Sequence, residues 1–429
     1  MVSIISDFLV EAQARGFIHQ STDIEGLDEA MRSGRIVAYA GFDPTATSLH
    51  VGHLVPIMLL RLLQRKGHKP IVIMGGATAR IGDPSFKNEM RKMLSDEQIK
   101  ENIASIQNVF QQFLEFGPGG NKAIMLDNAE WLTKLAYLDF LRDFGVHITV
   151  NRLLTFDTIK TRLENNQPLS FLEFNYMLFQ AYDYYHLNKN FSCTLQIGGS
   201  DQWANILNGV EFIRRTSQKT AYGLTTPLLT TASGAKMGKT ENGAVWLNPE
   251  LMSDYDFWQF WRNTHDEDVI RFLKMFTDLP LSEIDTLSNL TGQDLNEVKK
   301  LLADEVTKIV RGDHSLASIH ETSSKLFEQT VQAYSIKGYD GLSNPILDTS
   351  LPVIDMSLND IDELQAFVCV VKAGLAETNG EARRLIRGKG IKIQDIMVGD
   401  ENLMITIPED RVIKVSAGKK RHALIRLVV

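Results

Sequence analysis

The first 225 or so residues carry short apolar runs separated by longer stretches in which hydrophobic residues have helical spacing. Four of the runs are bounded by Gly, Pro or polar residues, and they cover 36–41, 70–74, 123–126 and 194–197. Short apolar runs that alternate with amphipathic helices are typical of a parallel sheet covered on both faces. The pattern therefore predicts an α/β fold for this part of the chain.

The same spacing predicts individual helices. One runs from about Thr47 to Lys66 and ends at Gly67, and another covers 170–185. Ser200 and Asp201 follow the fourth apolar run and are predicted to cap a third helix, because their side-chain oxygens can accept from free backbone N–H groups.

The pattern changes after residue 252, where Leu302, Val306 and Val310 exemplify long amphipathic helices and strand signals disappear. Further on, Pro, Gly and Ser turns with little periodicity indicate a linker. We therefore expect an α/β domain, a connecting segment, an α-helical domain, a linker and a small α+β domain, at 1–225, 226–252, 253–333, 334–358 and 359–429.

Composition narrows the class of protein. The chain has 429 residues, 44% of them hydrophobic, and only two cysteines, Cys193 and Cys369. These cannot form a disulfide framework or a clustered zinc site, so a reducing compartment is expected. No apolar run approaches the ~20 residues that span a bilayer, and the N-terminus, with Asp7 and Glu11, does not resemble a secretory or transit peptide. We expect a cytoplasmic protein that does not bind membranes.

The net charge of −8 argues at first against a nucleic-acid partner. The charge is uneven, however. From Asp362 onward the chain has 12 Lys plus Arg against 9 Asp plus Glu, so the C-terminal part is basic and the body is acidic. A basic module on an acidic body is compatible with RNA binding by that module.

The strongest local motif follows the first predicted strand: Gly41-Phe42-Asp43-Pro44-Thr45 and then His50-Val51-Gly52-His53. A helix N-terminus at the end of a strand favours phosphate, because its backbone N–H groups are free. His50 and His53 could donate to phosphate oxygens, and Gly52 would leave room for a nucleotide. A metal pair without a third ligand and two ordinary surface histidines remain as alternatives.

A second motif is Lys236-Met237-Gly238-Lys239-Thr240. It differs from a P-loop, because Ser233 stands where that pattern requires Gly. Two lysines on a Gly-flanked loop could neutralise a polyphosphate as its leaving group departs. A solvated charged loop is the alternative.

Together, HVGH and KMGKT resemble the paired HIGH and KMSKS motifs of class I aminoacyl-tRNA synthetases. Longer stretches are similar to bacterial-type tyrosyl-tRNA synthetases, at 39–45, 75–78, 81–85, 176–183 and 195–203. The resemblance extends from the N-terminus to the last residues. It implies a Rossmann-like catalytic domain for ATP and tyrosine, a mobile KMGKT loop, a helical domain for the tRNA anticodon arm and a small C-terminal RNA-binding domain.

At helical spacing Tyr176, Gln180 and Asp183 share one arc of the helix at 170–185, which is otherwise rich in Phe, Leu and Met. A surface Asp is the alternative for Asp183. The resemblance implies that Tyr39 and Asp183 bind the phenol hydroxyl of tyrosine, and that Tyr176, Gln180 and Asp83 hold its ammonium group. Phenylalanine would leave a buried carboxylate unpaired, so replacing Asp183 with Asn is predicted to impair tyrosine selection.

The implied reaction forms tyrosyl-adenylate and pyrophosphate from tyrosine and ATP, then transfers tyrosine to the terminal ribose of tRNA(Tyr). The resemblance implies γ-phosphate contacts by Thr45 and His50, and Gln202 near the reacting carboxylate. Further residues are implied to bind ATP or to grip pyrophosphate: Asp43, Gly52, His53, Gly198, Asp201, Lys87, Arg91, Lys236 and Lys239. Magnesium is expected to arrive with ATP, with no dedicated protein ligands and no tightly bound cofactor.

Several positions depart from the family pattern: Ala79-Arg80, Pro56, Ala40 and Ala204. Arg80 adds a cation that is expected close to the site, and Pro56 lies in the helix after HVGH.

In the basic tail, Arg383, Arg384 and Arg387 lie on one predicted helix, and Lys419 and Lys420 form a second cluster. Two arginines one helical turn apart could clamp RNA phosphates, although a solvated helix is the alternative. The resemblance also implies a homodimer.

The sequence also bears on three other functions. A tryptophanyl-tRNA synthetase is disfavoured by Tyr39 with Asp183. A non-catalytic RNA-binding or splicing factor would be expected to lose HVGH or the lysines of KMGKT, and a small-molecule nucleotidyltransferase would lack the basic tail.

Overall fold

The structure is a computed structural model of the chain, and it describes residues 4–83, 94–231, 243–321, 351–357, 364–394, 396–405, 411–418 and 421–428, together with 234, 237, 239, 240 and 407. Contacts divide it into two compact units. Unit 1 comprises 1–248 and 265–298, and unit 2 comprises 249–264 and 299–429. Because these units cut across the expected helical domain, the functional boundaries at 225, 252, 333 and 358 remain predictions.

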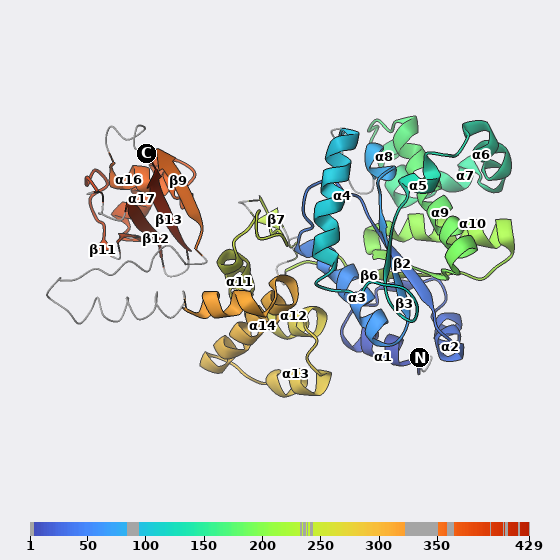
Figure 1. Ribbon diagram of the computed structural model, residues 1–429, viewed down its shortest axis with the longest axis horizontal. Coiled ribbons are helices and arrows are strands. Elements are labelled where there is room, and N and C mark those ends of the chain that lie inside the picture. Colours follow the sequence, from blue (N-terminus) through green and yellow to red (C-terminus); the bar gives the residue numbers. More distant parts are fainter. Residues whose placement is uncertain are drawn as a thin grey trace. The chain divides into compact units, whose positions relative to one another are not determined.

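A six-stranded sheet forms the centre of unit 1 (Figure 1). Its strands, in spatial order, are β1 (Gln20–Ser21), β6 (Tyr222–Thr226), β5 (Leu195–Gly199), β2 (Val37–Phe42), β3 (Lys69–Met74) and β4 (Ile124–Asp127). All neighbours are parallel except β1 with β6. The predicted parallel α/β sheet is confirmed, with strand ends within two residues of the apolar runs.

The strand order reverses between β2 and β5. From β2 the chain first adds β3 and β4 on one side, and later adds β5 and β6 on the other. In open parallel sheets, ligands bind beyond the carboxyl ends of the strands at such a reversal. The fold thus directs attention to the residues that follow Phe42 and Gly199.

Helices cover both faces of this sheet (Figure 1). Tyr39 belongs to one face and packs with Tyr184 of α9, whereas Phe42 belongs to the other and packs with Phe110 of α4. The helices of this first part are α1 (Asp7–Ala14), α2 (Ile24–Ser33), α3 (Leu54–Arg65), α4 (Asp96–Phe110), α5 (Ala129–Leu132), α6 (Tyr137–Asp143), α7 (Val150–Leu153), α8 (Asp157–Glu164), α9 (Phe171–Phe191) and α10 (Trp203–Ser217).

Short 3₁₀ turns and a small hairpin complete the region around the sheet. The turns are η1 (Val51–His53), η2 (Thr78–Arg80), η3 (Gly145–His147) and η4 (Ser200–Gln202). Strands β7 (Lys239–Thr240) and β8 (Gly243–Ala244) pair as an antiparallel hairpin.

Helix α9 supplies several predicted site residues. Its N-terminus is fixed by a capping box, in which Ser170 accepts from the backbone N–H of Glu173 and the Glu173 carboxylate accepts from that of Ser170. The helix ends where Ser192 adopts a left-handed conformation. It begins where the pattern predicts and continues past the predicted end at residue 185.

Two local predictions are wrong. The helix predicted from Thr47 begins only at Leu54, because residues 49–51 instead pair through their backbone with residues 245–247. Ser200 and Asp201 do not cap α10; they lie within η4, which makes no side-chain cap.

Beyond residue 252 the described helices are α11 (Asp254–Arg262), the 3₁₀ turn η5 (Asp266–Asp268), α12 (Val269–Phe276), α13 (Leu281–Leu287) and α14 (Gln293–Arg311). Since no strand is assigned over 253–321, the predicted change to helices is borne out for those residues. Residues 322–333 lie outside the described part.

The C-terminal module has a five-stranded sheet in the order β11 (Ile396–Met397), β10 (Ile391–Ile393), β12 (Val412–Ala417), β13 (Arg421–Val428) and β9 (Val353–Ser357). Helices α16 (Ala366–Lys372) and α17 (Asn379–Arg387) share its apolar core. The predicted linker 334–358 is corrected at its end, because 353–357 form β9 in parallel with β13. Residues 334–350 lie outside the described part.

Candidate active site

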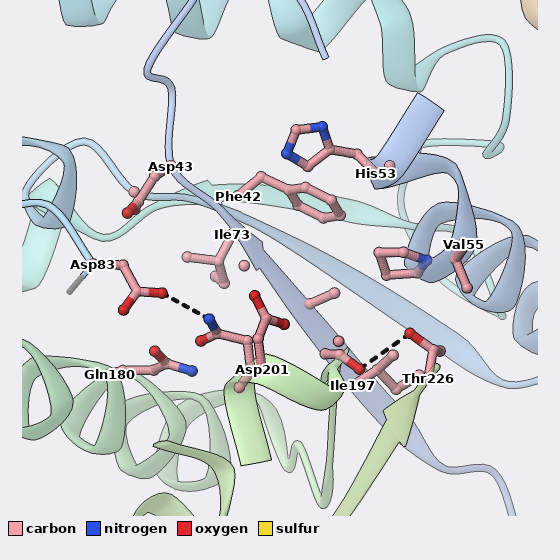
Figure 2. A pocket seen from close by; sticks show the side chains of 18 of the residues that line it. Phe42, Asp43, His53, Val55, Ile73, Asp83, Gln180, Ile197, Asp201 and Thr226 are labelled. Carbon is pink, nitrogen blue, oxygen red and sulfur yellow. Dashed lines mark hydrogen bonds between the residues drawn. The ribbon is translucent and has the colours of Figure 1, made fainter. Parts of the chain in front are cut away.

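A cavity of about 490 Å³ opens beyond the carboxyl ends of β2 and β5, at the strand reversal. Its volume is in the range of small-molecule sites. Predicted site residues that line it are Tyr39, Asp43, Thr45, His50, Gly52, His53, Asp83, Tyr176, Gln180, Asp183, Gly198, Asp201 and Gln202. Figure 2 shows Asp43, Asp83 and Gln180 toward one end of the cavity, with Val55 and Thr226 toward the other.

The two histidines of HVGH form a small reciprocal cap. His50 Nδ1 accepts from the backbone N–H of Gly52 at 3.1 Å, and His53 Nδ1 accepts from the backbone N–H of His50 at 3.2 Å. A neutral imidazole whose Nδ1 accepts must carry its proton on Nε2. Both rings are therefore held in the tautomer that presents an Nε2–H donor.

The carboxylate of Asp183 is buried in the wall of the cavity, with 4% of the residue exposed. Trp131 Nε1 donates to its Oδ1 at 2.7 Å, and Asn128 Nδ2 donates to its Oδ2 at 3.0 Å. Burial raises the pKa of Asp183 to about 7, because it outweighs these two hydrogen bonds. Asp183 is thus a buried, oriented acceptor in the cavity wall rather than a surface residue.

Tyr39 projects from β2 into the same region and is 2% exposed. Among the described residues its hydroxyl has no hydrogen-bond partner. Burial, aided by the charge of Asp183, raises the pKa of Tyr39 well above its usual value, so the phenol stays neutral. A buried hydroxyl without a partner is costly, which makes this position receptive to a polar ligand group.

Asp43 lies directly after β2 and is held by two donors. Tyr176 Oη donates to its Oδ2 at 2.9 Å, and Thr78 Oγ1 donates to its Oδ1 at 2.7 Å. A side chain at Gly75 would collide with this arrangement, because a Cβ there would lie 2.1 Å from Asp43 Oδ1. Glycine at position 75 therefore lets the carboxylate approach the backbone after β3.

A chain of amides connects Gln180 to Asp83. Gln202 Nε2 donates to Asp83 Oδ2 at 2.7 Å (Figure 2), while Asn205 Nδ2 donates to the side-chain oxygens of both Gln202 and Gln180 at 3.1 Å. The acceptors are thereby fixed around one end of the cavity. Carboxylate and amide oxygens so arranged can bind a cationic group.

Some predicted residues are not brought together by the described structure. Lys87, Arg91, Lys236, Lys419 and Lys420 lie outside the described residues. Lys239 begins β7.

Among the departures from the family pattern, Ala40 and Pro56 line the cavity. Pro56 is the one of these two that lies in a helix. It occupies the first turn of α3, where its missing N–H breaks no helical hydrogen bond. Arg80 is not among the described lining residues and pairs with Asp96 at 3.2 Å, so its guanidinium has a carboxylate partner outside the lining; an effect of this cation on the site stays a prediction.

Sequence reasoning missed the residues that support the wall. Asn128 and Trp131 hold Asp183, and Thr78 bonds both Asp43 and Asn128. Asn128 comes immediately after β4, so the rule that sites form at the carboxyl ends of parallel strands could have identified it. Trp131 offers no such signal.

In the C-terminal module, Arg383 and Arg387 are one turn apart on α17 and share one carboxylate. Arg387 makes two hydrogen bonds of 2.5 and 2.8 Å to Glu401, and Arg383 lies 3.5 Å from the same group while stacking 4.0 Å over Phe367. Arg384 is exposed. The predicted pair of phosphate clamps is therefore already partly neutralised.

Among the described residues, no helix is both long enough and apolar enough to cross a bilayer.

Comparison with known proteins identifies the family. Residues 31–328 match the model described as tRNA synthetases class I (W and Y). A tyrosine–tRNA ligase of Caulobacter vibrioides is 53% identical over 99% of both chains, and one of Zymomonas mobilis is 52% identical over 99% of this chain and all of its own.

Solved structures of tyrosyl-tRNA synthetases are also similar to this chain. A C-terminally truncated mitochondrial tyrosyl-tRNA synthetase of Aspergillus nidulans has a TM-score of 0.68 at 32% identity, over 75% of this chain and 94% of its own. The tyrosyl-tRNA synthetase of Archaeoglobus fulgidus, complexed with L-tyrosine, shares the fold, with a TM-score of 0.52 at 18% identity over 71% of this chain and all of its own. The cavity at the strand reversal, its HVGH segment and these near full-length matches have one explanation: the chain belongs to the class I tRNA synthetases, among the tyrosine–tRNA ligases.

Proposed function

We propose that the chain activates tyrosine with ATP and then transfers it to the terminal ribose of tRNA(Tyr). In the first step a carboxylate oxygen of tyrosine attacks the α-phosphorus, the bond to the bridging oxygen breaks, and pyrophosphate leaves. In the second step a ribose hydroxyl attacks the activated carbonyl, loses its proton, and AMP leaves. The carboxylate is already a nucleophile, so the first step depends on positioning and charge stabilisation.

The observation that carries this proposal is that one cavity contains both an oriented carboxylate and a hydroxyl without a hydrogen-bond partner among the described residues. Asp183 and Tyr39 both line the cavity, and both are almost fully buried. A substrate phenol could donate to Asp183 and accept from Tyr39, which would give the Tyr39 hydroxyl a partner. Phenylalanine offers neither group, and the indole of tryptophan can only donate.

The hydrogen-bonded side chains that connect Gln180 to Asp83 support a site for the ammonium group of tyrosine. We assign this group to Tyr176, Gln180 and Asp83, whose oxygens surround one end of the cavity. Gln202, which donates to Asp83, is assigned to the neighbourhood of the reacting carboxylate.

The nucleotide is assigned to the other end, where HVGH leads into α3. His50 and Thr45 would contact the terminal phosphates, and His53, Gly198 and Asp201 the adenosine side. The Nε2–H donors fixed by the reciprocal histidine cap suit phosphate oxygens. Lys87, Arg91, Lys236 and Lys239 are assigned to pyrophosphate on the family resemblance.

Magnesium enters this proposal with ATP. The described residues contain no group of three or more His, Cys, Asp or Glu side chains that could hold a metal ion, so the phosphates would supply most of its ligands. We place the reaction in the cytoplasm, since both free cysteines are buried and suit a reducing compartment.

We assign the tRNA to the C-terminal module and the helices beyond residue 252. Within the module the candidate contacts are Arg383, Arg384 and Arg387 on α17, with Lys419 and Lys420. A small cationic module suits RNA that is recognised by shape and backbone.

We also propose that the chain forms a homodimer. Large apolar side chains are exposed over one stretch of 36 residues, from α6 to the start of α9: Tyr137, Leu138, Leu141, Val146, Val150, Leu154, Leu163, Phe171 and Leu172. Buried Phe140, Leu153, Ile159 and Met177 join these helices in one core, which keeps their outer faces together. An apolar patch of this kind indicates a protein interface, and a second copy is the partner that the family resemblance favours.

Two experiments test these proposals. Tyrosine-dependent exchange of labelled pyrophosphate into ATP is expected; no exchange with tyrosine, or equal exchange with tryptophan, would contradict the proposed reaction. In sedimentation, the wild type is expected to be a dimer and Leu138→Glu with Val146→Glu a folded monomer. A monomeric wild type would refute the dimer.

A further inference from the structure

The HVGH segment is held in place by a stretch of chain almost 200 residues downstream. Val51 donates its backbone N–H to Val245 O at 2.9 Å, and Leu247 donates to Leu49 O at 2.8 Å. His50 and Trp246 lie opposite each other in this antiparallel bridge. The backbone of His50, just before η1, is thus fixed by a segment distant in sequence.

Asn248 extends the same connection. Its backbone N–H donates to Ser48 Oγ at 3.1 Å, and its side-chain Nδ2 donates to Thr47 O at 3.3 Å and to Ser105 Oγ of α4 at 2.9 Å. Residues 245–248, which we call the brace, therefore bind every part of the chain from Thr47 to Val51.

The contact continues through the rings. The ring of Trp246 lies edge-on to that of His50, with centroids 6.3 Å apart and planes at 65°. The His50 ring in turn lies 4.1 Å from that of His53. With Nδ1 of His50 already accepting from Gly52, these contacts define the direction of its Nε2–H donor.

The brace also begins where the lysine motif ends. Lys239 pairs with Ala244 in the β7–β8 hairpin, and Val245 follows at once. A short length of backbone therefore joins the second lysine of KMGKT to the strand partner of HVGH.

We propose that Trp246 is a positioning residue for His50, and that the brace sets the geometry of the nucleotide end of the cavity. This rests on the proposed function and adds to it a residue outside both motifs. Trp246 acts through His50 and is not among the described residues that line the cavity. Removing its ring should harm the use of ATP and leave tyrosine binding unchanged, because the tyrosine acceptors lie on other elements.

The test is a double-mutant cycle of Trp246→Leu and His50→Ala, followed by pyrophosphate exchange. Trp246→Leu alone is expected to lower kcat/KM for ATP by about tenfold, with the KM for tyrosine unchanged, because small displacements of positioned groups are costly. In the His50→Ala background the same change is expected to have less than about a twofold effect.

Two further variants keep the test informative. If Trp246→Leu does not fold, Asn248→Ala tests the brace in its place. It keeps the Trp246 ring, removes the side-chain hydrogen bonds of Asn248, and should show the same selective loss in kcat/KM for ATP. Trp258→Phe, a buried Trp of α11, is the matched control and should leave kcat/KM for ATP unchanged.

Equal losses of Trp246→Leu in both backgrounds, or an equal change in the KM for tyrosine, would overturn the positioning role. Absence of exchange in the wild type would instead overturn the proposed function, and this inference with it.

Discussion

Trp131 donates its indole N–H to Asp183 across 2.7 Å, from a short helix after β4 to the long helix α9. Asn128, three residues before Trp131, donates to the other oxygen of the same carboxylate. Two donors from one segment fix the plane of a group that burial alone would drive toward its neutral form. The orientation of Asp183 is therefore built by the chain after β4, and several predictions depend on it.

Replacing Asp183 with Asn is predicted to weaken the preference for tyrosine over phenylalanine. Loss of a hydrogen bond to a charged acceptor costs about 2 kcal/mol, or roughly 30-fold in kcat/KM for tyrosine. The ratio of kcat/KM for the two amino acids in pyrophosphate exchange measures the effect. Asp285→Asn, at an exposed ion pair with Lys274, is the control, and an unchanged ratio in Asp183→Asn would refute the assignment.

Recognition of tyrosine is predicted to depend on pH through the same group. The pKa of Asp183 is about 7. Only the ionised carboxylate accepts at both oxygens, and protonation turns one of these acceptors into a donor that cannot serve Trp131, Asn128 or the phenol. The value of kcat/KM for tyrosine should therefore fall as pH decreases below about 7. Trp131→Phe removes a donor to the ionised form, so it should shift this limb to higher pH. A limb that does not move in Trp131→Phe would contradict the mechanism.

Stability should show the opposite trend with pH. The pKa of Asp183 rises from 3.8 to about 7 on burial, so the folded chain binds the proton more tightly between these values. The contribution of Asp183 to the free energy of unfolding therefore decreases as pH rises from about 4 to about 7. The Tm of Asp183→Asn minus the Tm of the wild type should therefore increase as pH is raised from 5 to 8. A difference in Tm that does not change with pH would refute this.

Gly75→Ala is predicted to disrupt the Asp43 network. The new Cβ would lie 2.1 Å from Asp43 Oδ1 and 2.5 Å from Thr78 Oγ1. These two oxygens are hydrogen-bonded to each other. Forcing them apart should destabilise the protein by about 1–3 kcal/mol and lower exchange activity. Gly34→Ala is the control, since a Cβ at residue 34 meets no atom within 4 Å. Equal Tm values for the two variants would contradict the prediction.

Glu401→Gln is predicted to strengthen the contact of the small domain with RNA. It releases Arg383 and Arg387, whose charges the carboxylate now partly neutralises. Affinity for tRNA should rise, and the slope of log K against log salt should steepen by about one. Asp355→Asn, which frees Arg426 on β13, is the matched control. A slope that is unchanged, or that changes equally in the control, would exclude a role for this arginine pair.

Periodicity and motifs predict the sheet, the helix α9 and most of the cavity lining, because a parallel sheet places the ends of its strands together. The contact between His50 and Trp246 could not be predicted, since it joins segments almost 200 residues apart whose pairing has no local pattern. For the same reason the predicted start of α3 is wrong. Local spacing favours a helix from Thr47, but long-range backbone pairing prevails there.

The partners of charged side chains are harder to predict from the sequence than the helices that carry them. The sequence predicts a cation at Arg80 close to the cavity, but it does not predict that this side chain pairs with Asp96. Arg383 and Arg387 do share a face, as their spacing predicts, but sequence gives no sign that Glu401, more than ten residues later, meets both. Ion pairs between distant elements depend on the packed fold, which a helical pattern does not specify.

The brace has a consequence for the order in which the protein is made. HVGH leaves the ribosome early, but its strand partner at 245–247 is translated almost 200 residues later. At about 5–20 residues per second this interval is on the order of 10–40 seconds. During that time the nascent chain carries the histidines without the segment that fixes them. The nucleotide end of the cavity therefore gains this backbone support only after the lysine motif has been synthesised.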